Sequence, residues 1–109
     1  MAKFKLGKLI ATAAIVDKMQ NDHAFAAFVS KSIRRYEDQD WGDSPDEEKL
    51  QNDYAVENGE RVLASYKQDM AIHDRKIIWI TTEQDRSATT ILFPEEYRGG
   101  DEDARRFTE

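Results

Sequence analysis

The clearest pattern of apolar and polar positions lies in the last third of the chain, where the period is two. Residues 61–67 alternate between apolar and polar side chains, which predicts a half-buried strand. Residues 76–82 and 88–93 are rich in β-branched and aromatic side chains, which predicts two further strands. The turn-forming segments 68–75 and 83–87 separate the three strands, so we expect an antiparallel meander that stops at Pro94.

The first third of the chain predicts a short strand followed by two helices. Residues 5–12 form the expected strand, and Thr12 is placed to cap a helix over 13–20. Residues 22–36 form the second expected helix, because apolar side chains recur there at the spacing of one helical face. That face consists of Phe25, Phe28, Val29, Ile33 and Tyr36.

A third helix is expected from about residue 45 to residue 58. Ser44 is the predicted cap, a proline follows at the first helical position, and Glu47 completes a capping box. Leu50 and Tyr54, with Val56 or Ala55, are predicted to face the core, and Gly59 is predicted to end the helix in the left-handed conformation.

The predicted order of elements is therefore β-α-α-α-β-β-β, an α+β fold. We expect an antiparallel sheet, made of the C-terminal meander and the N-terminal strand, with the helices packed on one face. Residues 1–97 are predicted to form a single domain. Residues 98–109, which include a pair of glycines, are predicted to be a mobile or weakly helical tail.

The composition narrows the possible chemistry. The 109 residues include no cysteine, so disulfides, a thiolate nucleophile and cysteine-ligated zinc are excluded. The longest apolar stretch, residues 9–16, is too short to span a membrane, and Asp17 and Lys18 follow it without a signal-peptide cleavage site. We expect a cytoplasmic protein without a cofactor.

The charge of the chain is unevenly distributed. The net charge is −6, yet residues 37–60 contain ten acidic residues and a single lysine. An acidic middle argues against a general nucleic-acid-binding protein, since phosphates require a basic surface. The alternative for this segment is an ordinary solvated helix with its loop.

Three phrases in the chain carry a family resemblance. They are Lys8-Leu9-Ile10-Ala11-Thr12, Asp40-Trp41-Gly42-Asp43, and the ending from Ile80 to Tyr97 that contains Asp85-Arg86-Ser87 and Pro94-Glu95-Glu96-Tyr97. Together they resemble a family of small proteins carried on plasmids, integrative elements and prophages, from which this chain departs in a longer 68–75 loop and in residues 98–109. That family carries no established activity, so the resemblance implies only a mobile-element accessory protein.

The acidic segment supplies the candidate binding residues. A calcium loop starting at Asp38 fails, because Asp43 stands where glycine is needed and Lys49 stands where a bidentate glutamate is needed. Trp41 is either a core anchor or a partly exposed binding anchor with an acidic rim. The candidate partner-binding residues are Asp38, Asp40, Trp41, Asp43, Asp46, Glu47, Asp53 and Glu57.

The remaining motifs have ordinary structural interpretations. Asp85 and Ser87 are predicted to bond the backbone of a tight turn, in which Arg86 pairs with a nearby acid; as an alternative, Arg86 binds a carboxylate or phosphate. His23 and His73 lack any metal-ligand spacing and are predicted to be surface residues.

The leading hypothesis is a non-enzymatic protein that binds a protein partner. In its sharper form, the acidic 37–60 surface imitates nucleic-acid charge and inhibits a host defence or nucleic-acid enzyme. One alternative is a nucleic-acid-binding module that uses Lys31, Arg34 and Arg35 of the helix at 22–36. Another is a small enzyme with an unrecognised site. A homo-oligomer is also possible, because a meander sheet leaves an edge that a second copy could cover.

Overall fold

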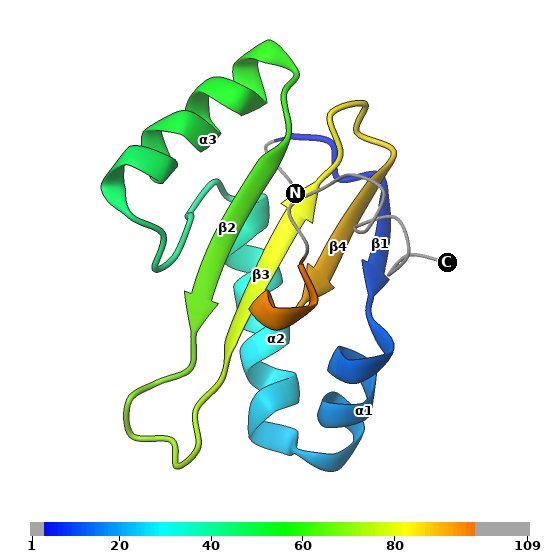
Figure 1. The fold of residues 1–109 in the computed structure, drawn as a ribbon, viewed down its shortest axis with the longest axis vertical. Helices are drawn as coiled ribbons and strands as arrows, with labels where there is room; N and C mark the ends of the chain where they lie inside the picture. The colour runs from blue at the N-terminus through cyan, green and yellow to red at the C-terminus, as the bar shows by residue number, and fades with distance from the viewer. Residues whose placement is uncertain (1–3, 98–109) are drawn as a thin grey trace.

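A computed structural model describes residues 4–97 as an α+β fold, which confirms the predicted class (Figure 1). The expected tail, residues 98–109, lies outside the described residues. The order of elements differs in detail from the prediction, because a short 3-10 helix follows the last strand. In chain order the elements are β1 (Lys8–Ala11), α1 (Ala13–Asn21), α2 (His23–Glu37), α3 (Asp46–Asn58), β2 (Val62–Lys67), β3 (Ile77–Thr82), β4 (Ala88–Leu92) and η1 (Pro94–Glu96).

The sheet is mixed, so the prediction of an antiparallel sheet is wrong for its first strand. The strand order is β1-β4-β3-β2, and β1 runs parallel to β4 while the other neighbours are antiparallel. A parallel pair needs a long crossover connection, and the three helices between β1 and the meander supply it. Gly7, with φ +67°, brings the chain into β1 so closely that an added Cβ would lie 2.3 Å from the Arg86 carbonyl oxygen. Glycine is therefore required there.

The helices do not all cover one face of the sheet, which corrects the second part of the prediction. α2 lies behind the sheet and α1 packs against α2 below the end of β1, whereas α3 lies alongside the β2 edge (Figure 1). The Asn52 side chain holds α3 there: its Nδ2 donates to the Leu63 carbonyl at 2.9 Å, and its Oδ1 accepts from the Leu63 N–H at 3.3 Å. Asn52 thus acts toward β2 as a neighbouring strand would.

The main core lies between the sheet and α2. The inward residues of β2, β3 and β4 meet the apolar face that the sequence predicts for α2, on which Phe25, Val29 and Tyr36 are fully buried. The prediction for that helical face is confirmed; Phe28 and Ile33 pack partly buried against the same core.

A chain of buried hydroxyl groups crosses this core. Thr89 Oγ1 donates to the Leu6 carbonyl at 2.7 Å, so its only hydrogen is used there. Thr82 Oγ1 must therefore donate to Thr89 Oγ1 at 2.7 Å, and the Tyr36 hydroxyl must donate to Thr82 Oγ1 at 2.6 Å. Burial raises the pKa of Tyr36, so the phenol remains the donor.

Two of the three predicted helix signals are confirmed. Thr12 Oγ1 accepts from the Ile15 N–H at 3.3 Å at the start of α1, and Gly59 ends α3 with φ +68°. The predicted start of α3 is wrong: the helix begins after Pro45, which is its N-cap and not its first helical residue, and neither a Ser44 cap nor a capping box with Glu47 forms. The Ser44 hydroxyl instead donates to the Trp41 carbonyl at 2.8 Å and accepts from the Ser65 N–H at 3.0 Å, because the sheet edge competes for it.

The opposite face of the sheet is only partly covered. η1 crosses in front of the sheet, and Tyr97 makes an edge contact with Trp79 of β3 at 5.4 Å between ring centroids (Figure 1). β3 is thus contacted on both faces, since Ile78 and Ile80 are buried in the core on the other side. Among residues 4–97, no helix is long and apolar enough to cross a membrane.

Candidate protein-binding site

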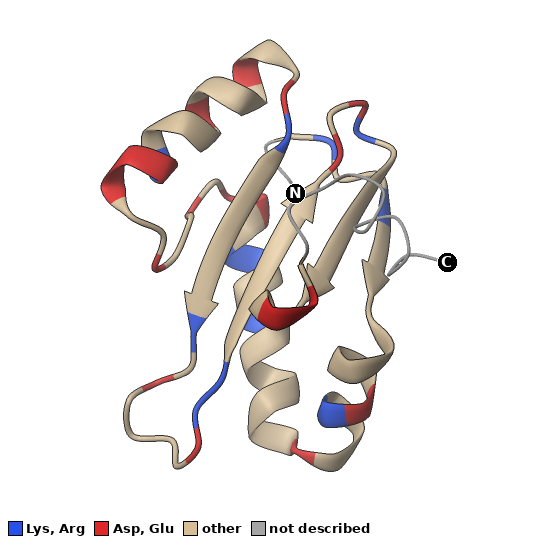
Figure 2. Ribbon diagram, in the orientation of Figure 1, with Lys and Arg blue, Asp and Glu red and all other residues tan. Residues whose placement is uncertain are grey.

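The acidic segment 37–60 divides into two parts with different roles. Residues 38–43 form the loop after α2, and the acids of residues 46–60 lie on α3 and just beyond it (Figure 2). Two of the loop acids are bonded within the fold, whereas the α3 acids are exposed, although Asp53 among them also accepts a hydrogen bond from Trp41. The structure therefore does not bring all the predicted site residues into one patch.

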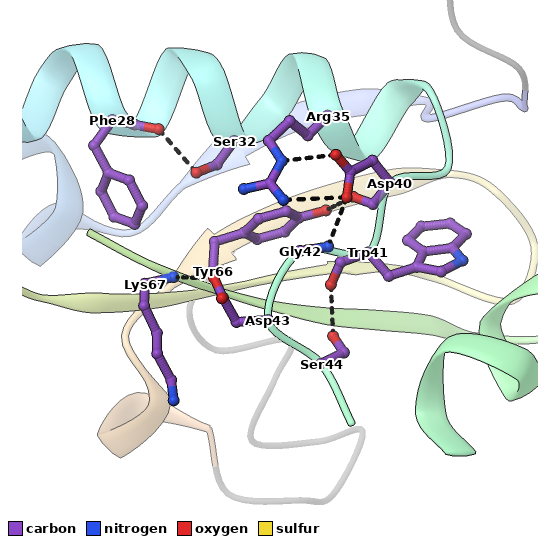
Figure 3. Close-up of polar contacts among 10 residues, drawn as sticks. All are labelled: Phe28, Ser32, Arg35, Asp40, Trp41, Gly42, Asp43, Ser44, Tyr66 and Lys67. Carbon is purple, nitrogen blue, oxygen red and sulfur yellow. Dashed lines mark hydrogen bonds and ion pairs between the residues drawn. The ribbon is translucent and has the colours of Figure 1, made fainter. Parts of the chain in front are cut away.

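Asp40 is held by the protein itself. Its carboxylate accepts from Arg35 Nε at 2.8 Å, from Arg35 Nη2 at 3.2 Å and from the Gly42 N–H at 3.0 Å (Figure 3). The bonds from Arg35 are the main reason why the pKa of Asp40 lies below its ordinary value. The Asp40 carbonyl accepts from the Tyr66 hydroxyl at 2.8 Å, which ties the loop to β2. Asp40 is thus committed to the fold.

Asp43 closes the edge of β2. Its N–H donates to the Ser65 carbonyl at 2.8 Å. Its Oδ2 accepts from the Lys67 N–H at 2.9 Å (Figure 3). Gly42 allows this approach: its φ is +64°, and a Cβ there would lie 2.4 Å from the Tyr66 ring. Asp38, by contrast, is exposed at the C-cap of α2.

Trp41 is a core residue. Only 3% of it is exposed, and its ring packs against Tyr36 and Phe4. Its Nε1 donates to Asp53 Oδ1 of α3 at 2.8 Å, so the indole fixes the helix to the loop. The interpretation of Trp41 as a partly exposed binding anchor is therefore wrong.

The outer face of α3 presents two large apolar side chains to solvent. Leu50 is 72% exposed and Tyr54 is 57% exposed, which corrects the prediction that both face the core. The residues that do face inward are Asn52 and Ala55, which are buried. A small and a polar side chain occupy the inner face because α3 lies against the polar backbone edge of β2, where bulky side chains would keep it away.

Four predicted binding residues surround this apolar pair. A helix advances 100° per residue, so residues three and four apart share a face. On that basis the outward face of Leu50 and Tyr54 is shared by Asp46, Glu47, Asp53 and Glu57. We call these six residues the α3 face. Sequence reasoning missed its apolar centre, although the same helical spacing would have placed Leu50 and Tyr54 among the acids.

The basic residues of α2 are only partly available. Lys31 and Arg34 are exposed, whereas the Arg35 guanidinium is engaged by Asp40 and lies over the Tyr66 ring at 5.6 Å. Two exposed basic side chains on one helix can contact only a few phosphate groups. The α2 surface therefore supports nucleic-acid binding less well than the sequence alone suggested.

Arg86 has a structural role that differs from both predictions. Its guanidinium donates to the Ala55 carbonyl at 2.9 Å and to the Glu60 carbonyl at 2.7 Å, beside the C-terminus of α3. A cation there complements the helix dipole, so Arg86 pairs with carbonyl groups and not with an acid. The predicted turn chemistry of Asp85 is confirmed, since its Oδ1 accepts from the Ser87 N–H at 3.0 Å. Hydrogen bonding to Ser87 also lowers the pKa of Asp85.

An open groove of about 900 Å³ lies on the partly covered face of the sheet, between α3 and Tyr97. Its charged lining is mixed, with Asp43 and Glu48 on one side and Arg61 and Lys67 along β2. This mixture does not select one class of ligand. Within residues 4–97, no group of three or more histidine and acidic side chains could hold a metal ion. His23 and His73 are both exposed, as predicted.

Comparison of the chain with protein-family models, with curated proteins and with solved structures found no match in any of the three.

Proposed function

We propose that this chain is a non-enzymatic accessory protein of a mobile genetic element, which acts in the cytoplasm by binding a protein partner through the α3 face. The observation that carries the proposal is the exposure of Leu50 and Tyr54 among four exposed acidic residues, of which Asp53 also accepts the hydrogen bond from Trp41. Aromatic and aliphatic anchors inside a polar rim are typical of protein-binding hot spots. The mobile-element setting rests on the resemblance of the three sequence phrases.

The chemistry of the α3 face defines the partner. A complementary surface has an apolar pocket for the Leu50 and Tyr54 side chains and basic residues around it. The nucleic-acid-binding groove of a host defence protein or nucleic-acid enzyme has that combination of charge and aromatic-lined pockets. Occupation of such a groove would inhibit the enzyme by excluding its nucleic acid.

The apolar centre separates this proposal from the nucleic-acid-binding alternative. A phosphate-binding surface gains nothing from an exposed leucine on an acidic helix, so the α3 face favours a protein over nucleic acid. A gel-shift assay with duplex and single-stranded DNA is expected to show no salt-dependent binding. If binding appears and is lost in a Lys31→Glu/Arg34→Glu variant, the α2 surface is the functional one.

Site-specific cross-linking tests the proposal directly. A photoreactive p-benzoylphenylalanine replaces Tyr54 in one sample and the 82% exposed Met70, in the distant β2–β3 loop, in the matched control. We expect a partner to cross-link in host extract from position 54 alone. With the purified partner, Leu50→Ala is expected to raise the dissociation constant about 30-fold, which corresponds to a loss of about 2 kcal/mol in binding free energy, the size expected for a hot-spot residue.

Charge reversal then separates the acidic rim from the apolar centre. Glu47→Lys/Glu57→Lys is expected to slow association and to reduce its dependence on salt, with little change in dissociation. Equal cross-linking from positions 54 and 70, or an affinity unchanged by Leu50→Ala, would refute the assignment of the α3 face.

A further inference from the structure

The β2 edge and the β1 edge of the sheet differ in whether their outward backbone groups are hydrogen-bonded, and this difference is separate from the α3 face. The outer edge of β2 is closed: Asn52 pairs with the backbone of Leu63, and the loop before α3 pairs with Ser65. The Lys67 N–H is also taken, by the Asp43 carboxylate. A second strand cannot add to this edge, because its hydrogen-bonding groups are already paired.

Within residues 4–97, no other strand pairs with the outer edge of β1. The Lys8 N–H donates to the Ser87 carbonyl, and β1 pairs in parallel with β4 in that register. Backbone direction alternates along a strand, so the N–H and C=O groups of Leu9 and Ala11 point away from β4. No hydrogen bond from the described residues reaches these outward groups. Leu9 is also 50% exposed, and no labelled helix or strand lies beyond β1 (Figure 1).

We propose that a second copy of this chain pairs with β1, so that two four-stranded sheets join into one. A closed dimer of identical chains is two-fold symmetric, which requires the two β1 strands to run antiparallel. With Ile10 on the two-fold axis, Leu9 lies opposite the partner's Ala11, and each of these pairs exchanges two main-chain hydrogen bonds. This register uses every outward polar group of β1.

Side chains on both faces of β1 fit this register. Lys8 and Ile10 lie on the η1 face of the sheet with Ala88 and Thr90, so the two Ile10 side chains meet at the axis. Leu9 lies on the other face and covers the partner's Ala11. Each pair therefore removes apolar surface from water.

Charge complementarity also supports a second copy as the occupant. In this register Lys8 lies opposite the partner's Thr12, and directly opposed side chains lie about 5 Å apart. In each chain, Thr12 Oγ1 donates to Glu96 Oε1 at 3.0 Å, and the exposed Glu95 lies next to it. The ammonium group of Lys8 thus approaches a carboxylate of the other chain. Symmetry gives this interaction twice, and no like charges face each other across the strands.

The interface is small, because β1 contains four residues while strands are usually five to six residues long. We therefore expect weak, concentration-dependent association, with a dissociation constant of up to about 1 mM. This inference is independent of the α3 face, since β1 and α3 lie at opposite edges of the sheet (Figure 1).

Amide hydrogen exchange tests the register. Sedimentation first establishes whether the 109-residue chain dimerises as its concentration rises. Exchange at the Leu9 and Ala11 amides is then expected to slow at least several-fold between the monomer and the dimer. The Lys8 and Ile10 amides are the internal control, because they bond to β4 in both states.

Two substitutions test the surface itself. Leu9→Lys is expected to abolish the dimer, whereas Met70→Lys, the same charge change at an exposed loop, is expected to leave it intact. Lys8→Glu gives a second test that does not alter the packing of Leu9, and it is expected to weaken dimerisation at least several-fold. Thermal unfolding of each variant verifies its fold. A chain that stays monomeric up to about 1 mM, or a dimer that survives both Leu9→Lys and Lys8→Glu, would overturn the proposal.

Discussion

The buried hydroxyl chain gives the most quantitative prediction about the core. In Thr82→Val the side chain keeps its shape but loses its hydroxyl, so the Tyr36 hydroxyl loses the acceptor that lies 2.6 Å away. Tyr36 and Thr82 are fully buried, so water cannot replace the lost bond. Thr89 keeps its bond to the Leu6 carbonyl. The main cost is therefore one orphaned phenol hydroxyl, and we expect a loss of about 1–3 kcal/mol in the free energy of unfolding.

A double-mutant cycle isolates that cost. Tyr36→Phe removes the donor and leaves Thr82 bonded to Thr89, so it is expected to cost about 0.5–1.5 kcal/mol, the net value of one hydrogen bond. In Tyr36→Phe/Thr82→Val no orphaned phenol remains. The double variant is therefore expected to lose less stability than the sum of the two single variants, by about 1 kcal/mol.

Urea unfolding, followed by tryptophan fluorescence and circular dichroism, measures these free energies. Thr90→Val is the matched control, because Thr90 lies in the same strand as Thr89 and makes no side-chain hydrogen bond among the described residues. It is expected to change stability by no more than about 0.5 kcal/mol. The reasoning is refuted if Thr82→Val costs no more than Thr90→Val, or if the costs in the cycle simply add.

Two further predictions concern the loop after α2 and the end of α3. Gly42→Ala is expected to lower stability by more than Gly59→Ala. Both positions have positive φ, so the strained backbone costs about 1–2 kcal/mol in either variant, but only Gly42 lies against the Tyr66 ring. Equal urea midpoints for the two variants would contradict the expected clash between the added methyl group and that ring. The folded-state pKa of Asp40 is lowered from 3.8, first by hydrogen bonding to Arg35, so its contribution to stability is present above about pH 4 and is lost as the pH falls through the lower folded-state value. Asp40→Asn is therefore expected to be less stable than the natural chain at pH 7 and to lose less stability between pH 5 and pH 3. If the free energy of unfolding fell equally with pH in the two proteins, Asp40 would not contribute to stability in this way.

The predictions that succeeded depend on short-range signals. The Thr12 cap and the Gly59 terminus need only a few neighbouring residues, because a cap acts within one helical turn. The apolar face of α2 is periodic over four turns, so its burial follows from the sequence alone.

The predicted orientation of α3 is wrong, because it depends on a contact with another part of the chain and not on a local pattern. Leu50 and Tyr54 are the largest apolar side chains of that helix, so the sequence suggested that they face inward. α3 instead packs its Asn52 against the main-chain groups of β2, an interaction that no local pattern reveals. The same competition between partners moved the Ser44 hydroxyl from a helix cap to the sheet edge.

Propensity, periodicity and capping act over a few residues, so the helices and strands of this chain follow from its local sequence. The parallel pairing of β1 with β4, the position of α3 at an edge of the sheet, and the burial of Trp41 with the exposure of Leu50 and Tyr54 follow only from the assembled fold. Those outcomes depend on contacts between residues far apart in the chain. Their free energies are set by which backbone groups and side chains remain unpaired once the rest of the fold has formed.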